Sequence, residues 1–166
     1  MHIDRSVIRV KAMLIARNRD HTAHAVTFNA PTSENPAGYH RLIGGTVELG
    51  ESHHDTIRRE IDEELGATIR RLSFVTTVEN IFTINGVIGH EVVFVHSGYL
   101  DPQPPTVAAT LTESDGSSVP VVWRSMTGRH ETVPLYPSAV EPLIAGTQSG
   151  ARGAAALYSG DAGDMR

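Results

Sequence analysis

The chain has 166 residues, 40% of them hydrophobic, and suits one globular domain, because two domains from so short a chain would each be marginal in size. The absence of cysteine excludes disulfides, thiolate catalysis and cysteine-ligated zinc or iron–sulfur sites. The net charge of −5 argues against a nucleic-acid polymer as partner, since proteins that bind such polymers normally present a basic face to the phosphates.

The start of the chain does not resemble a signal peptide, because charged residues such as Asp4, Arg5 and Arg9 interrupt every short apolar run. No later stretch is apolar for long enough to span a bilayer. We therefore expect a cytoplasmic protein that does not associate with membranes.

The first part of the chain predicts three strands. Residues 6–16 (SVIRVKAMLIA) and 24–28 are rich in β-branched residues and bounded by polar turns, so we expect two strands that pair with each other. Residues 31–38 (PTSENPAG) form a turn-rich loop, and residues 39–43 form a short strand that runs into a pair of glycines.

Residues 52–65 are the clearest predicted helix. Ser52 and Asp55 form a capping pattern at its start, and Gly66 ends it. An apolar stripe at helical spacing runs along it, formed by Ile57, Ile61 and Leu65. The spacing therefore predicts an amphipathic helix.

After this helix the sequence predicts three more strands, at residues 69–78, 92–99 and 119–123. The dipeptide Asn85-Gly86 predicts a turn between the first two. The proline-rich beginning of the segment 101–118 separates the second from the third, and we expect this segment to be exposed.

The end of the chain predicts one more helix and a tail. The helix is expected at residues 135–145, opened by Pro137 and kinked by Pro142. Residues 147–166 are rich in Gly, Ala and Ser, which predicts a flexible tail after a domain of residues 1–146.

Seven acidic residues are crowded into the segment 44–67. At 100° per residue, Glu60, Glu63 and Glu64 lie on one side of the predicted helix. Like charges three and four residues apart destabilise a helix by about 0.2–0.5 kcal/mol per pair, unless a cation lies between them. Carboxylate oxygens suit Mg²⁺ or Mn²⁺, whose coordination is normally completed by water and by substrate phosphates. The pattern therefore predicts a metal site for a phosphorylated substrate.

Such ions would polarise phosphorus and activate a water molecule, while one carboxylate takes the proton. Gly44, Gly45 and Gly50 let the backbone bend and approach a ligand closely, so a main-chain carbonyl is a candidate metal ligand. Arg59 is placed to hold the preceding loop through an ion pair with Glu51.

The order Gly45, Glu51, residues 59–64 (REIDEE) and Gly66 resembles the Nudix box. Only the last position departs from it, where Ala67 stands and a larger aliphatic residue is usual, which affects packing more than chemistry. The strands before and after the box are also similar to that family. The resemblance implies an α+β fold, an α/β/α sandwich around a mixed β-sheet.

The same resemblance implies a hydrolase that cleaves the pyrophosphate bond of a nucleoside diphosphate linked to another moiety, with Mg²⁺ or Mn²⁺ as cofactor. The implied metal ligands are the Gly45 carbonyl, Glu60, Glu63 and Glu64. The implied catalytic residues are Glu60, Glu63, Arg59 and Glu51, and which carboxylate acts as the base varies within the family. The expected partner is a small-molecule nucleotide substrate, and a homodimer is an assembly to be tested, because family members often dimerise.

Two other functions remain open. One is hydrolysis of nucleoside triphosphates, including oxidised ones, and the other is a Nudix-like sensor that binds a nucleotide without cleaving it. No Pro or Tyr lies between Glu79 and Gly89, where members acting on ADP-ribose or dinucleoside polyphosphates would be expected to carry one. The intact carboxylates of the box count against the sensor.

Residues 79–82 (ENIF) and 89–92 (GHEV) look like a pattern in Nudix proteins of unassigned substrate. Glu91 is then either a further metal ligand or general base, or a paired surface glutamate, and we also count it among the substrate-binding candidates. His90 is interpreted as a histidine satisfied by local hydrogen bonds rather than as a general acid.

Arg41 stands shortly before the two glycines and would project near the bound phosphates, where its planar guanidinium suits them. His53 and His54 are expected to be exposed to solvent, so a zinc site is not expected. Trp123 and Tyr136 either stack on a base or belong to the core, and the core is favoured for the sole tryptophan.

Overall fold

The computed structural model describes residues 7–150, and this part of the chain contains eight strands and two α-helices. The strands are β1 (Arg9–Arg17), β2 (Ala23–Asn29), β3 (Tyr39–Thr46), β4 (Thr68–Ile84), β5 (Val87–Asp101), β6 (Thr110–Thr112), β7 (Ser118–Ser125) and β8 (Leu135–Tyr136). The helices are α1 (His53–Leu65), the short 3-10 helix η1 (Ser138–Val140) and α2 (Glu141–Gly150). None of the described helices is long and apolar enough to cross a membrane.

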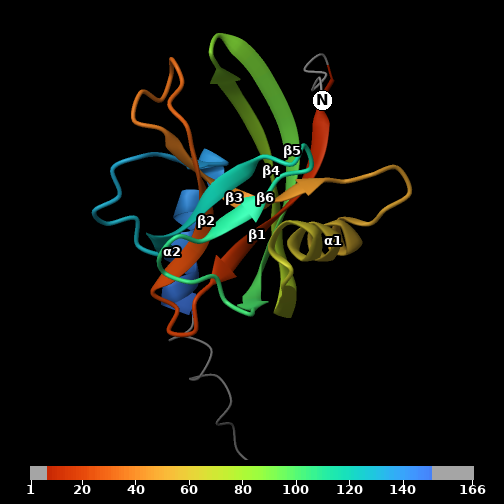
Figure 1. The fold of residues 1–166 in the computed structure, drawn as a ribbon, viewed down its shortest axis with the longest axis vertical. Helices are drawn as coiled ribbons and strands as arrows, with labels where there is room; N and C mark the ends of the chain where they lie inside the picture. Colours follow the sequence, from red (N-terminus) through yellow and green to blue (C-terminus); the bar gives the residue numbers. More distant parts are fainter. Residues whose placement is uncertain (1–6, 151–166) are drawn as a thin grey trace, which may run out of the picture.

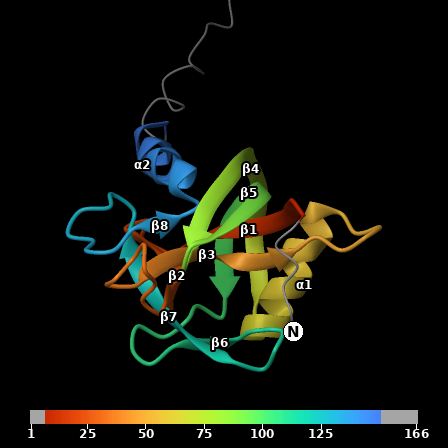
Figure 2. The ribbon, with the colours of Figure 1, turned by 90° about the horizontal axis from the view of Figure 1, so that it is seen from above.

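The strands form one mixed sheet in the order β4-β5-β1-β3-β2-β7-β6, with β8 beside β3 (Figures 1 and 2). β1 runs parallel to β5 over nine residue pairs and antiparallel to β3 over four. The predicted pairing of the first two strands is confirmed only at their ends, where Ala16 and Arg17 of β1 oppose Ala25 and His24 of β2. The main partners of β1 are therefore β3 and β5.

Successive side chains of β1 point to opposite faces of the sheet, and the core is therefore divided into two layers. Ala12, Leu14 and Ala16 pack in the cluster that contains Ile57 and Ile61 of α1. Met13 and Ile15 pack in a second cluster, with Val140 of η1 and Ile144 of α2. Figure 2 shows α1 and α2 on opposite sides of the sheet. The predicted α/β/α sandwich around a mixed sheet is confirmed.

Helix α1 has the ends that its sequence predicts. The Ser52 side chain caps it by accepting a hydrogen bond from the Asp55 backbone N–H at 3.1 Å. Gly66 ends it in the left-handed region with φ of 59°, which suits a residue without a side chain. Ile57 and Ile61 are both 0% exposed, so the predicted apolar stripe is the buried face.

The helix predicted at residues 135–145 is wrong in its first half. Leu135 and Tyr136 extend as β8 because they pair with His40 and Arg41 of β3, and this sheet contact overrides the local helical pattern. Pro142 is the second residue of α2, where its missing N–H needs no partner, so it does not interrupt that helix.

The tail predicted from residue 147 is only partly within the described residues. α2 continues to Gly150. Residues 151–166 lie outside the described residues.

The segment 101–118 is not exposed throughout, contrary to expectation. β6 lies within it and pairs with β7, which leaves Leu111 only 2% exposed and Ala109 8% exposed. The predicted Asn85-Gly86 turn is confirmed, although β4 and β5 reach it from both sides and are longer than the sequence pattern indicates.

Candidate active site and metal-binding residues

A cleft of about 460 Å³ opens where α1, the end of β3 and the loop after β6 meet. Its acidic residues come from α1, from the loop before it and from the loop after β6, namely Glu60, Glu63, Glu64, Glu48 and Glu113. Its floor comes from β3, through Gly44, Gly45 and Thr46, and its basic residues are Lys11, Arg41 and Arg59. The structure thus places in one cleft the three helix carboxylates and two of the three glycines expected from the sequence, whereas Gly50 is not among the residues that line it.

Gly45 lies so close to Glu60 that no larger residue fits between β3 and α1. A Cβ atom added to Gly45 would lie 2.0 Å from Glu60 Cδ and 2.1 Å from its Oε1. Gly44 has φ of 150°, and a Cβ there would lie 2.1 Å from the Ala12 carbonyl oxygen of β1. The two glycines therefore let the β3 backbone approach the helix carboxylates on one side and β1 on the other.

Arg59 is hydrogen-bonded to three carboxylates at once. It donates from Nε and Nη2 to the two carboxylate oxygens of Glu51 at 2.8 and 2.9 Å, so the predicted ion pair is confirmed. Its Nη1 donates to Glu60 Oε1 at 2.9 Å and to Glu63 Oε2 at 3.1 Å. Its Nη2 also donates to the Thr46 carbonyl at 3.2 Å, which ties the loop of the box to β3.

The carboxylates of the site differ in the direction in which their pKa values are shifted. Hydrogen bonds from Arg59 and Thr56 hold the pKa of Glu51 at about 2. Burial raises the pKa of Glu60, against the opposing effect of Arg59. Burial, with the nearby carboxylates of Glu113 and Glu60, raises the pKa of Glu64 to about 8. The pKa values of Glu60 and Glu64 are therefore raised when no cation is bound, and that of Glu60 is raised despite its hydrogen bond from Arg59.

The donor set fits a divalent cation that keeps part of its water shell. Among residues 7–150, no three His, Asp or Glu side chains form a ready-made metal cage. The cleft instead offers Glu60, Glu63, Glu64 and the Gly45 backbone, all hard oxygen donors. Mg²⁺ and Mn²⁺ suit such open sites, because water and substrate phosphates complete their coordination.

Lys11 and Glu113, two charged residues of the cleft, were not predicted as site residues from the sequence. Lys11 donates to Thr46 Oγ1 at 2.8 Å, and burial, with the nearby Arg41, lowers its pKa to about 8. The sequence feature that could have singled out Lys11 is that it is the only lysine in the chain. Glu113 reaches the cleft on the β6–β7 hairpin, and the Asp115-Gly116 dipeptide at the turn of this hairpin is the signal that would have predicted it.

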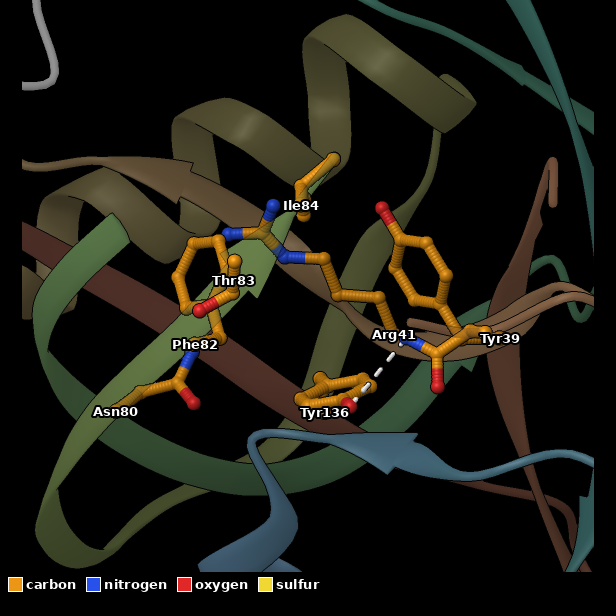
Figure 3. A pocket seen from close by; sticks show the side chains of 8 residues that line it. Tyr39, Arg41, Asn80, Phe82, Thr83, Ile84 and Tyr136 are labelled. Atoms are coloured by element: carbon orange, nitrogen blue, oxygen red, sulfur yellow. Dashed lines mark hydrogen bonds between the residues drawn. The ribbon is translucent and has the colours of Figure 1, made fainter. Parts of the chain in front are cut away.

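A small aromatic pocket adjoins the cleft and shares Arg41 with it (Figure 3). Tyr39, Phe82 and Tyr136 are its aromatic residues. Asn35 donates to the Tyr136 hydroxyl at 3.4 Å. In Figure 3 the Arg41 side chain crosses the pocket between Tyr39 and Phe82. Arg41 thus lines the cleft beside Gly44 and Gly45, its role in phosphate binding stays a prediction, and Tyr136 lines the adjoining pocket.

Glu91 is paired as one interpretation expected, but it is not on the surface. It is 0% exposed, bonded to Arg9, Arg41 and Asn80, and it is not among the residues that line the cleft. The other interpretation, a metal ligand or general base, would need free carboxylate oxygens facing the cleft. The local pairing expected for His90 is confirmed by its contact of 2.8 Å with Glu79.

The expected solvent exposure of His53 and His54 is wrong, because both are half-buried. The His53 ring stacks on Phe94 with centroids 4.3 Å apart, and its Nδ1 lies 2.9 Å from His96 Nε2. The aromatic side chains of β5 thus cover the first turn of α1. Trp123 packs against the core, as favoured for the sole tryptophan.

The NUDIX domain model matches residues 8–125 of the chain. The chain belongs to the Nudix family. Members of this hydrolase family cleave pyrophosphate bonds in small-molecule nucleotide substrates and generally use divalent metal cations. No curated protein sequence is similar enough to this chain to count as a match.

Solved structures of Nudix proteins share the fold. A MutT NUDIX hydrolase from Burkholderia pseudomallei superposes with a TM-score of 0.59 at 23% identity, covering 82% of this chain and 96% of that one. A NUDIX hydrolase from Nitrosomonas europaea gives a TM-score of 0.56 at 17% identity, covering 87% and 90%. At such low identity these proteins establish the fold and not the substrate.

Proposed function

We propose that this Nudix protein hydrolyses the pyrophosphate bond of a nucleoside diphosphate linked to another moiety, with Mg²⁺ or Mn²⁺ as cofactor. The observation that carries the proposal is the gathering of Glu60, Glu63 and Glu64 against the Gly45 backbone in one cleft, next to an aromatic pocket. An acidic cleft on an acidic protein repels a polyphosphate unless cations lie between the two sets of negative charges.

The Gly45 carbonyl, Glu60, Glu63 and Glu64 would hold the cation. When bound, it neutralises the phosphate charge, polarises the phosphorus and makes a water molecule more acidic. Arg59 acts indirectly: its contacts with Glu51 and with the Thr46 carbonyl keep the loop of the box against α1. The ligands therefore remain close to β3 even when no cation is present.

One carboxylate of α1 then accepts the proton that the attacking water loses. The oxygen of the attacking water forms a bond to one phosphorus, the bond from that phosphorus to the bridging oxygen breaks, and a carboxylate of α1 takes the proton. Glu60 and Glu63 are the candidates for this base. The Glu63 side chain is 59% exposed, so water reaches it, whereas that of Glu60 is only 13% exposed.

The aromatic pocket supports a substrate with a ring system. Tyr39, Phe82 and Tyr136 provide faces and edges on which a base can stack. The side-chain amides of Asn35 and Asn80 also line the pocket and offer donors and acceptors for the edge of a base. A ring bound there leaves its attached phosphates directed toward Arg41 and the cleft.

A panel of nucleotides tests the proposal. Purified protein is incubated with Mg²⁺ or Mn²⁺ and nucleoside diphosphates linked to sugars, alcohols or a second nucleoside, together with ordinary and oxidised nucleoside triphosphates. Products are identified by mass spectrometry. Glu64→Gln is compared with Asp62→Asn, a matched change on the same helix but outside the cleft.

Cleavage of a linked diphosphate that Glu64→Gln abolishes and Asp62→Asn preserves supports the proposal. A clear preference for triphosphates would replace it with the pyrophosphohydrolase alternative. Tight nucleotide binding without any product, across the panel and with either cation, would identify a sensor instead.

A further inference from the structure

One side of the cleft carries two basic residues, Lys11 and Arg41, whose side chains form no hydrogen bond with the expected metal ligands. Lys11 uses one donor on Thr46 Oγ1 and has no other partner in the described part of the chain, so two of its N–H groups remain available. Arg41 uses only Nη2, which donates to Glu91 Oε1 at 3.1 Å and to Oε2 at 3.3 Å. Its Nε and Nη1 have no partner among residues 7–150. Both side chains line the cleft with donors unused.

Glu91 fixes the position of Arg41. Its carboxylate is fully buried and accepts from Arg41, from Arg9 Nη2 at 2.9 Å and from Asn80 Nδ2 at 3.1 Å. A buried carboxylate requires such partners, and losing one of them leaves an uncompensated charge. Arg41 is therefore held against Glu91 by a contact that is costly to break.

The charges of this group do not cancel. The ion pair with Arg9 offsets the charge of Glu91, which leaves the positive charges of Lys11 and Arg41 in the cleft. These charges also act on Glu60 and Glu64, but no carboxylate of the described residues occupies the remaining donor set of the two side chains. A phosphate is the ligand that matches this donor set, since unused ammonium and guanidinium donors bind phosphate oxygens by charge-assisted hydrogen bonds.

We propose that Lys11 and Arg41 form a phosphate subsite that needs no metal, and that Glu91 is the positioning residue that holds Arg41 in it. The subsite rests on the proposed function and refines it. Because Arg41 borders both the aromatic pocket and the cleft, it binds the phosphate next to the ring, while the following phosphate lies at the helix carboxylates. Glu91 is accordingly neither a metal ligand nor the general base.

Binding of ADP to the full chain in EDTA, measured by calorimetry, tests the subsite. Arg41→Gln is expected to weaken metal-free binding roughly 10- to 100-fold, the effect of losing hydrogen bonds to a charged group. Glu91→Gln is expected to weaken it about tenfold, because Arg41 is no longer anchored. Arg9→Gln is the matched control: it removes an ion pair to the same carboxylate, but Arg9 lines neither the cleft nor the pocket.

Arg9→Gln is expected to leave ADP affinity within about threefold of the wild type. Equal losses in Arg9→Gln and Arg41→Gln would show that only the neutralisation of Glu91 matters, and this would overturn the proposal. Absence of metal-free ADP binding by the wild type would overturn it as well. If Glu91→Gln does not fold, the comparison of Arg41→Gln with Arg9→Gln still decides.

The sole lysine gives an independent measurement. Acetylation of Lys11 by an amine-reactive reagent, followed by peptide mapping, is expected to slow several-fold when ADP is added in EDTA. An unchanged rate of Lys11 acetylation would contradict its place in the subsite.

Steady-state kinetics separates this proposal from the proposed function. With a substrate found in the nucleotide panel, Glu91→Gln is expected to raise KM about tenfold with kcat nearly unchanged, as for a residue that acts through binding. A large loss of kcat, together with loss of one limb of the pH profile, would make Glu91 the base and contradict its positioning role. Metal-free ADP binding without any turnover would contradict the proposed function and leave the subsite standing.

Discussion

Replacing Gly45 with Ala tests the close approach of β3 to Glu60. The added Cβ would lie 2.0 Å from Glu60 Cδ, whereas carbon atoms in contact lie about 3.5–4 Å apart. The Glu60 carboxylate must therefore retreat by about 1.5 Å or more, since the β3 backbone is fixed by its pairing with β1. A displacement of about 1 Å in a catalytic group costs on the order of 100-fold in rate, so we expect kcat of Gly45→Ala to fall by at least that factor.

The assay measures kcat at saturating substrate and Mn²⁺, together with the Mn²⁺ affinity and the melting temperature. Gly128→Ala is the control: its φ of 65° strains an alanine and is expected to lower the melting temperature, but a Cβ there meets no atom within 4 Å and this glycine lies outside the cleft, so kcat is expected to stay unchanged. A Gly45→Ala protein that is folded, binds Mn²⁺ normally and keeps kcat within about threefold of the wild type would refute the reasoning.

Three further predictions concern stability and its pH dependence. Ile61→Ala removes a fully buried side chain of α1 and is expected to lower the free energy of unfolding by about 2–4 kcal/mol, measured by urea denaturation. The raised pKa of Glu64 means that the folded state binds more protons than the unfolded state. The contribution of Glu64 to the melting temperature in EDTA, measured as wild type minus Glu64→Gln, is therefore expected to decline as pH rises from 4.5 to about 8. Glu113→Gln removes the negative charge near Glu64, so we expect the midpoint of this decline to move to lower pH. An unmoved midpoint would exclude an electrostatic interaction between the two carboxylates.

The helix of the box was predictable because its signals are local. The Ser52 cap, the stripe through Ile57 and Ile61 and the stop at Gly66 all act within the helix or next to it. The pairing of Arg59 with Glu51 was also predictable, since both belong to the box and are separated by only eight residues. Most of the acidic side of the cleft could therefore be predicted from contacts between residues close in the sequence.

The basic side of the cleft depends on contacts that local patterns do not contain. Lys11 meets Thr46 across 35 residues, and Arg41 meets Glu91 across 50, through the pairing of distant strands. The burial of Glu91 follows from the position of β5 between β4 and β1, and not from its neighbours in sequence. β8 was missed for the same reason, because only its contact with β3 makes it a strand.

Titration of Mn²⁺ and Mg²⁺ into metal-stripped protein, followed by calorimetry with and without ADP, tests most directly whether cations neutralise the clustered glutamates. The account predicts uptake of both cations by the wild type, at least about tenfold weaker binding in Glu60→Gln and Glu64→Gln, and no change in Asp62→Asn. Absence of uptake by the wild type, with or without ADP, would contradict it.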